Sequence, residues 1–243
     1  MPDLSTTEAQ KILAGVVIPP RPSIVSAIMD EQGRPDPDLG RIGQLISNDV
    51  GLAAAVLKTI NSPLYGLRQQ VGSIEQAVMM LGMKNVSSLV MGLALRNNIP
   101  SAGLDRFWDS ATRTALASSY LAKTLGCSSR EDAHLFGLFH DCGIPLLMQR
   151  FPDYKETLAL ANRAGDRVFT DIEDERHQTN HTVVGNLLAS NWKLPEHLRE
   201  GILYHHDPTV FDIGLPALTV NLIATMYLAE SIENGFSRLA TDA

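Results

Sequence analysis

Residues 135–143 read LFGLFHDCG and place the adjacent pair His140 and Asp141 inside an otherwise apolar run. An imidazole and a carboxylate in such surroundings need a physical reason. Both groups are good ligands for zinc, iron, manganese or nickel. The alternative is a helix end whose polar groups are satisfied locally, and the dipeptide alone favours this reading because adjacent helical side chains diverge. A metal site therefore requires that other ligands converge on the pair.

The composition around this stretch predicts an all-helical protein. The chain has 243 residues, of which 44% are hydrophobic and only 6% aromatic. Ala and Leu recur throughout, which suits helix packing better than a sandwich of aromatic-rich strands. The length is compatible with one large or two medium domains.

The charge distribution excludes some classes of partner. The net charge is −7, and residues 101–243 carry twelve Lys and Arg against nineteen Asp and Glu. A general nucleic-acid binder or a protein of anionic membranes would need a basic surface. The two cysteines, Cys127 and Cys142, form no CxxC metal pattern, and the N-terminus has no signal-peptide pattern. We therefore expect a cytoplasmic protein without general nucleic-acid binding and without a membrane association.

Local signals divide the chain into helices. Capping boxes, in which a Ser or Thr is followed three residues later by Glu or Gln, begin at residues 5, 73 and 128. Asp38 is placed to cap a helix, and Gly82 and Gly126 are placed to end one. The most polar stretch, residues 170–180, predicts a loop that leads into the first turn of the helix carrying His181.

Turn and helix-breaking residues cluster at residues 97–103, which read NNIPSAG. They predict a boundary between an N-terminal helical lobe, residues 1–100, and a second lobe, residues 101–243. The second lobe contains the His-Asp pair.

Further candidate ligands follow the pair in the second lobe. His181 lies at the start of a predicted helix, and His205 and His206 lie at the end of the next one. Several converging imidazoles would repel one another if protonated, so they indicate a shared cation or a neutral hydrogen-bonded cluster. Each also has a structural reading, because His181 could cap its helix and the His205-His206 pair could favourably end theirs.

The order of these motifs resembles the HD-type phosphohydrolase superfamily, and the flanking residues resemble its HDOD branch, the HD-related output domain of bacterial signalling proteins. The resemblance covers roughly residues 18–230. Its motifs are VIPPRP (17–22), NSPLYG (61–66), AVMMLG (77–82), FW (107–108), GLFHDCG (137–143), HTVVG (181–185) and WKLP (192–195). This combination is far more specific than a His-Asp dipeptide.

The resemblance implies an all-α, HD-domain-like helical bundle with an additional N-terminal helical lobe. It also implies a metal site formed by His140, Asp141, His181, His205 and His206, for iron, manganese, zinc or nickel, or a remnant that holds no metal. Three departures from the pattern of active enzymes stand out. The local pattern places Ser110 where active enzymes have a first His, Thr225 where they have a last Asp, and Ile144 where they often have a Lys.

These departures favour a regulatory HDOD module of bacterial signal transduction that acts through protein partners, with little or no catalysis. No residue is assigned a catalytic role. The alternative is a metal-dependent phosphohydrolase or phosphodiesterase acting on a nucleotide or a cyclic dinucleotide, and a nucleotide is also a candidate ligand of the regulatory module. Arg113 could replace the missing Lys, although an exposed or ion-paired surface position explains it better. A third reading is an interaction scaffold with a metal-free pocket.

Overall fold

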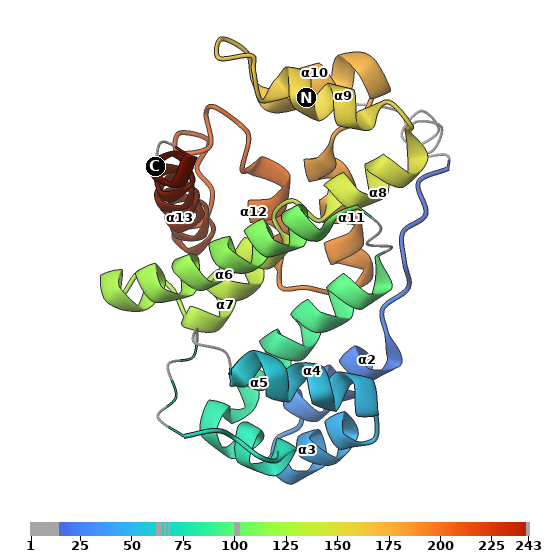
Figure 1. Cartoon of the computed structure of the whole chain (residues 1–243), viewed down its shortest axis with the longest axis vertical. Helices are drawn as coiled ribbons and strands as arrows, with labels where there is room; N and C mark the ends of the chain where they lie inside the picture. Colours follow the sequence, from blue (N-terminus) through green and yellow to red (C-terminus); the bar gives the residue numbers. More distant parts are fainter. Residues whose placement is uncertain (1–14, 62–64, 66, 68, 100–102, 242–243) are drawn as a thin grey trace.

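The computed structural model describes residues 15–61, 65, 67, 69–99 and 103–241, with side chains up to Ile232. Within these ranges the chain forms helices and no strand, so the prediction of an all-α fold is confirmed (Figure 1). The helices of the first lobe are α2 (Ser23–Gln32), α3 (Leu39–Ser47), α4 (Val50–Ile60) and α5 (Ile74–Asn98). Those of the second lobe are α6 (Asp105–Leu125), α7 (Arg130–Phe139), α8 (Gly143–Arg150), α9 (Tyr154–Ala161), α10 (Phe169–His177), α11 (His181–Asn191), α12 (Glu196–Tyr204) and α13 (Ala217–Thr241).

Most of the predicted helix ends are where the local signals place them. The Asp38 carboxylate accepts a hydrogen bond from the Gly40 amide at 2.7 Å and caps α3. The Ser73 hydroxyl accepts from the Gln76 amide at 3.2 Å and caps α5. Gly126 ends α6 in the left-handed conformation, with φ +65°. The capping box predicted at residue 5 lies outside the described residues.

Two local predictions are wrong. The cap of α7 is Ser129 rather than Ser128, because the Ser129 hydroxyl accepts from the Asp132 amide at 3.0 Å. Residues 170–177 are not a loop but belong to α10, which reaches His177. The polar composition was misleading because the buried side of α10 itself carries Glu173 and His177, which are satisfied by partners from α9.

The buried apolar residues form two clusters. One contains residues of α2, α3, α4 and the first part of α5, and the other contains Val25 of α2 and residues of the C-terminal part of α5 and of most helices from α6 onward. Within α5, Val90 belongs to the first cluster and Met91 to the second. The division at residue 100 stays a prediction, and α5 physically joins the two cores across it.

Helix α5 is the one described helix that is long and apolar enough to cross a membrane by length and composition, with a mean hydropathy of 1.5 over its apolar window. Half of that window is buried inside the protein. Gly82 also interrupts the helix, with a φ of +73° and a ψ of 169°. The apolar composition of α5 is thus explained by its contributions to the two cores.

The second lobe positions the His-Asp pair by close packing of helix ends. Helices α6 and α7 run side by side through the middle of the molecule (Figure 1). Helix α13 packs against both of them, α12 packs against α7 and α13, and α11 packs against α8 and α12. At the start of α8, a Cβ atom on Gly143 would lie 2.1 Å from the carbonyl oxygen of His181. Glycine is required here because the turn that follows Asp141 touches the backbone of α11 directly.

Candidate metal centre

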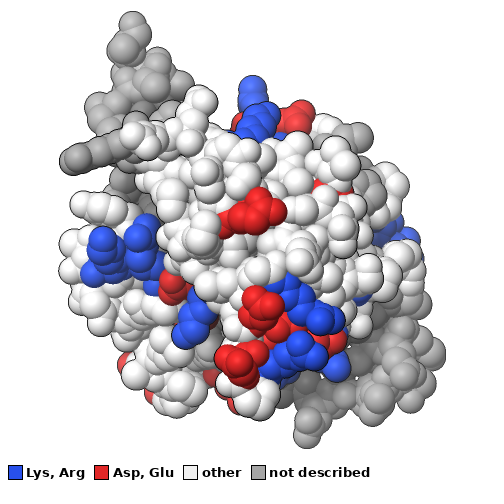
Figure 2. Space-filling model, turned by 90° about the horizontal axis from the view of Figure 1, so that it is seen from below, with Lys and Arg blue, Asp and Glu red and all other residues white. Residues whose placement is uncertain are grey.

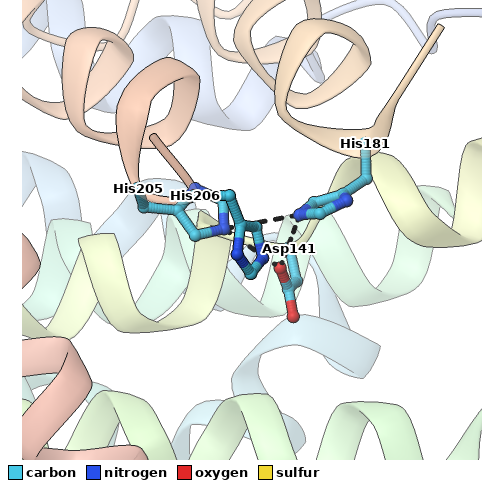
Figure 3. Close-up of side chains that lie close together, drawn as sticks. All are labelled: Asp141, His181, His205 and His206. Atoms are coloured by element: carbon cyan, nitrogen blue, oxygen red, sulfur yellow. Dashed lines mark hydrogen bonds and ion pairs between the residues drawn. The ribbon is translucent and has the colours of Figure 1, made fainter. Parts of the chain in front are cut away.

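The ends of three helices converge on one point. His140 follows the last residue of α7 and keeps helical dihedral angles, so Asp141 falls in the tight turn before α8. His181 is the first residue of α11, and Asn180 caps that helix by accepting from the amides of Thr182 and Val183 at 3.1 Å. His205 and His206 follow α12 directly. Figure 3 shows the four side chains of Asp141, His181, His205 and His206 facing one another.

One group of ligand-type atoms surrounds Asp141. Its Oδ1 lies 3.2 Å from His181 Nε2 and 3.4 Å from His205 Nε2, and the two Nε2 atoms lie 3.4 Å apart. With His206 included, one ligand atom from each of the four residues lies within 4.8 Å of every other. The structure thus brings together four of the five residues that the sequence predicts for this site.

The fifth predicted residue, His140, belongs to a second group that shares Asp141. His140 Nε2 lies 3.4 Å from Asp141 Oδ2 and 3.3 Å from Glu230 Oε1. These three residues also place their ligand atoms within 4.8 Å of one another. Each carboxylate oxygen of Asp141 therefore faces a different set of histidines.

Glu230, from α13, is a site residue that the sequence analysis did not anticipate. The sequence comparison places Thr225 where active enzymes have a last Asp, but the Thr225 hydroxyl donates to the Asn221 carbonyl at 2.6 Å and lies 3.4 Å from Cys127 Sγ. The Thr225 hydroxyl thus has its contacts within α13 and with Cys127, in the turn that follows α6. Glu230 supplies a carboxylate to the site instead, so the site is less depleted than the sequence predicts. A signal was present in the sequence, because Glu230 is an acidic residue in the apolar run of α13.

The backbone orients two of the imidazoles. His140 Nδ1 lies 2.8 Å from the Gly137 carbonyl oxygen, and His205 Nδ1 lies 2.9 Å from the Ile202 carbonyl oxygen. A carbonyl only accepts, so each Nδ1 carries the proton. In the neutral form of either ring, the lone pair is then on Nε2, the atom that faces Asp141.

A buried carboxylate orients the third imidazole. Glu173 has no exposed surface, and its Oε2 accepts from His181 Nδ1 at 2.7 Å. Its Oε1 accepts a hydrogen bond from the Tyr154 hydroxyl. The arrangement is the carboxylate–histidine pairing that fixes metal-ligating imidazoles in proteins. The sequence analysis missed Glu173 because it placed residues 170–177 in a loop, and the helical spacing of Ile172, Glu173 and His177 was the available signal.

The electrostatics of the cluster depend on burial and on the two carboxylates. Burial opposes the charged form of His181, but its contacts with Asp141 and Glu173 outweigh this and raise its pKa to about 9. The pKa of His140 is likewise raised well above its ordinary value, because Asp141 and Glu230 outweigh the effect of burial. The Asp141 pKa is held well below its ordinary value by the histidines, against burial.

The last two histidines stay neutral. Burial lowers the pKa of His205, and burial together with the neighbouring histidines lowers that of His206 to about 2. The His206 ring also stacks on Phe169, with centroids 5.2 Å apart and planes at 12°. These two imidazoles are ready to bind a cation without first losing a proton.

Asp141, His181, His206 and Glu230 line a cavity of about 480 Å³. Ser110 and Ile144 form part of its wall, where the resemblance places a first His and a Lys in active enzymes. The described residues of the wall include no Lys or Arg, and Arg113 is exposed and is not part of it. A phosphate in this cavity would meet no basic side chain from the described part of the chain.

The residues present fit a divalent transition metal. Asp141 Oδ1 is buried and has no hydrogen-bond partner among the described residues, although two imidazole nitrogens lie within 3.4 Å. Buried carboxylate oxygens are normally satisfied, so this geometry fits ligand atoms that could share one cation. Imidazole nitrogens with carboxylate oxygens suit iron, manganese, zinc and nickel.

Comparison with known proteins agrees with this architecture. The family model of the HDOD domain matches residues 18–208. An uncharacterized protein of Treponema pallidum (strain Nichols) is 28% identical over 216 residues, which are 83% of this chain and 41% of that protein. This chain therefore spans less than half the length of that relative.

Two solved structures show the same fold. A candidate phosphohydrolase from Shewanella amazonensis SB2B is 27% identical with a TM-score of 0.76, over 95% of this chain and 82% of that one. An HDOD domain protein of unknown function from Geobacter sulfurreducens is 26% identical with a TM-score of 0.73, over 90% of this chain and 76% of that one.

Proposed function

The chain belongs to the HDOD family, and we propose that it is a regulatory module of bacterial signal transduction that acts through protein partners. In this proposal Asp141, His181, His205 and His206 hold a divalent transition metal, and His140 with Glu230 completes the site. Little or no hydrolysis takes place there. The metal stabilises one arrangement of the helix ends that meet at Asp141, and partners recognise that arrangement.

One observation carries the proposal. The cavity contains ligand-type residues, but its described wall has Ser110 and Ile144 where the resemblance places a first His and a Lys in active enzymes. A hydroxyl is a weak metal ligand, and the aliphatic side chain of Ile144 cannot neutralise a phosphoryl oxygen. The site therefore retains the means to bind a cation and lacks some of the means to turn over a phosphate ester.

The chemistry of a bound metal would be that of a Lewis acid toward an oxygen-containing ligand. The residues of this chain prepare the site for it. His205 and His206 are neutral, Glu173 holds the His181 ring in place, and Asp141 is ionised and offers an oxygen to each ligand group.

A metal-dependent phosphohydrolase or phosphodiesterase is the second candidate function. It is favoured by the two ligand groups that share Asp141, because two ions held close together stabilise both the attacking and the leaving oxygen of a phosphoryl transfer. Glu230 strengthens the case for a phosphohydrolase, since it supplies a carboxylate where the sequence pattern indicated that one had been lost.

The test is to measure metal content and hydrolysis on the same protein. Elemental analysis of the purified chain, before and after reconstitution with iron, manganese, zinc or nickel, should find bound metal that Asp141→Asn removes. Hydrolysis of bis-p-nitrophenyl phosphate by the loaded protein should not exceed that by Asp141→Asn. Turnover that depends on Asp141 would refute the regulatory proposal in favour of the phosphohydrolase, and absence of any bound metal would refute both.

The proposed partners are proteins rather than nucleic acids, and the proposed location is the cytoplasm. Figure 2 supports the first point for one face, on which Lys and Arg side chains lie among Asp and Glu side chains and do not form a basic surface. If partners read the metal-bound arrangement, His140→Ala should weaken partner binding. An unchanged affinity in a pull-down with an identified partner would favour a metal-independent scaffold.

A further inference from the structure

A second cavity, of about 300 Å³, lies between the two lobes. Its wall comes from Tyr65, from α5 around Asn85, from α6 around Ser119, and from the start of α7. It shares no described lining residue with the cavity at Asp141. A smaller cavity of about 90 Å³ adjoins it, and both are lined by Leu116 and His134. Nothing in the proposed function uses this space.

Two buried nitrogen atoms beside these cavities have no hydrogen-bond partner in the described part of the chain. One is Nδ1 of His134, which lines both cavities. The other is Nε1 of Trp108, which lines the smaller one and whose side chain is 1% exposed. Buried polar atoms in proteins are nearly always satisfied, and an unsatisfied pair next to an open cavity indicates that a ligand completes them.

His134 would meet that ligand as a neutral ring. Burial, aided by the positive charge of Arg130, lowers its pKa to about 4. A neutral imidazole offers one donor and one acceptor. With the hydroxyls of Ser88 and Ser119, the inner wall presents a mixed set of donors and acceptors, which suits the polar edge of a heterocyclic ring.

The mouth of the cavity combines apolar and charged groups. Met80 and Tyr120 line it and are 53% and 67% exposed. Tyr120 therefore offers an aromatic face on which a flat ring can stack. Arg130 forms no ion pair with any residue that the structure describes, and Glu131 beside it contributes the opposite charge. One positive and one negative side chain at the mouth favour a ligand with one anionic group over a polyphosphate.

We propose that this cavity between the lobes binds a purine nucleoside monophosphate, with the base against Tyr120 and His134 and the phosphate on Arg130. The volume is at the lower end of the range for small-molecule sites, which suits one nucleotide and excludes a cyclic dinucleotide. The guanidinium matches a phosphate through paired charged hydrogen bonds. The proposal does not depend on a metal at Asp141.

The test is isothermal titration calorimetry of the full chain, freed of metal with a chelator, with AMP as the probe and adenosine and inorganic phosphate as its parts. AMP should bind, and Arg130→Ala should weaken AMP at least about tenfold while leaving adenosine within about twofold. His134→Phe should weaken both AMP and adenosine. Lys123→Ala, an exposed α6 position outside the cavity, is the matched control and should bind AMP like the wild type.

Thermal unfolding of each variant checks that it is folded, and the exposed Arg130 keeps the test decisive if His134→Phe does not fold. The proposal is overturned if the wild-type chain fails to bind AMP at millimolar concentration. It is also overturned if AMP binds but Arg130→Ala leaves its affinity unchanged, since the phosphate would then lie elsewhere.

Discussion

Replacing Glu173 with glutamine tests whether the buried carboxylate on α10 prepares His181 for a metal. Glu173→Gln keeps the size of the side chain but removes its charge. Both carboxylate oxygens are in use, one by His181 Nδ1 at 2.7 Å and the other by the Tyr154 hydroxyl. An amide can still accept from His181 Nδ1, and its NH₂ can donate to the Tyr154 oxygen. The variant should therefore fold, with His181 less firmly held and less basic.

The expected loss of metal affinity is 10- to 100-fold, about 1.4 to 2.8 kcal/mol, as is typical when the hydrogen-bond partner of a ligating histidine is changed. The loss depends on pH. The His181 pKa is raised to about 9, so at pH 7 a metal ion must displace a proton, which weakens wild-type binding by roughly two powers of ten. Glu173 contributes to that raised pKa, so in the variant the pKa of His181 is lower and the proton competes less with the metal. The loss should thus be full at pH 9 and smaller at pH 7.

The assay is competition between the protein and a chromophoric chelator for zinc, at pH 7 and pH 9. Glu175→Gln is the matched control, because it removes the same charge from the same helix at a side chain that is 64% exposed and paired with Arg167. It should bind zinc like the wild type. Equal zinc affinity of Glu173→Gln and wild type at pH 9 would refute the reasoning, as would an equal loss in Glu175→Gln.

Three further predictions concern the same fold. Because His181 must become neutral to bind a metal, the apparent zinc affinity of the wild type should rise with pH up to about 9, and zinc binding should release at least one proton. Calorimetry in buffers of different ionisation enthalpy measures this release, and no proton release would contradict the raised pKa of His181. Gly143→Ala should lower the free energy of unfolding by about 3 kcal/mol, since its Cβ would meet backbone atoms of α11, whereas Gly165→Ala, with nothing within 4 Å, should change it little; chemical denaturation measures both, and equal values would contradict the packing argument. Asn61→Ala should lower the free energy of unfolding by about 1 to 3 kcal/mol, because the Asn61 side chain donates to the Val71 carbonyl at 2.9 Å and accepts from the Val71 amide at 2.8 Å. Asn48→Ala, at an exposed position, should change the free energy of unfolding little in the same measurement.

The helix ends near the site could be predicted because their signals are local. Asp38, Ser73 and Gly126 cap or end helices through bonds and dihedral angles that involve only neighbouring residues. The shift from Ser128 to Ser129 shows the limit of such signals. Two adjacent serines satisfy the same pattern, and only the path of the chain selects one of them.

The two glutamates at the site, Glu173 and Glu230, could not be predicted from local signals. Glu173 lies in an acidic stretch and Glu230 at the end of an apolar run, and their importance depends on which way α10 and α13 face. The sequence pattern placed Thr225 where active enzymes have their last Asp, and the structure has a carboxylate, Glu230, five residues further along α13. Five residues along an α-helix rotate a side chain by about 140°, so positions 225 and 230 lie on different faces, and α13 packs against α6 and α7 in one way only.

The sequence by itself determined that the chain is all-helical, that it resembles HDOD proteins, and that His140, Asp141, His181, His205 and His206 are the residues to examine. These follow from apolar spacing, capping residues and motif order, which are properties of short stretches. The tertiary structure alone decided that Asp141 faces two groups of ligand-type atoms, that Glu230 and Glu173 join them, and that a separate cavity forms around His134. The physical reason is that each of these depends on side chains brought within hydrogen-bond distance by helices far apart in the chain.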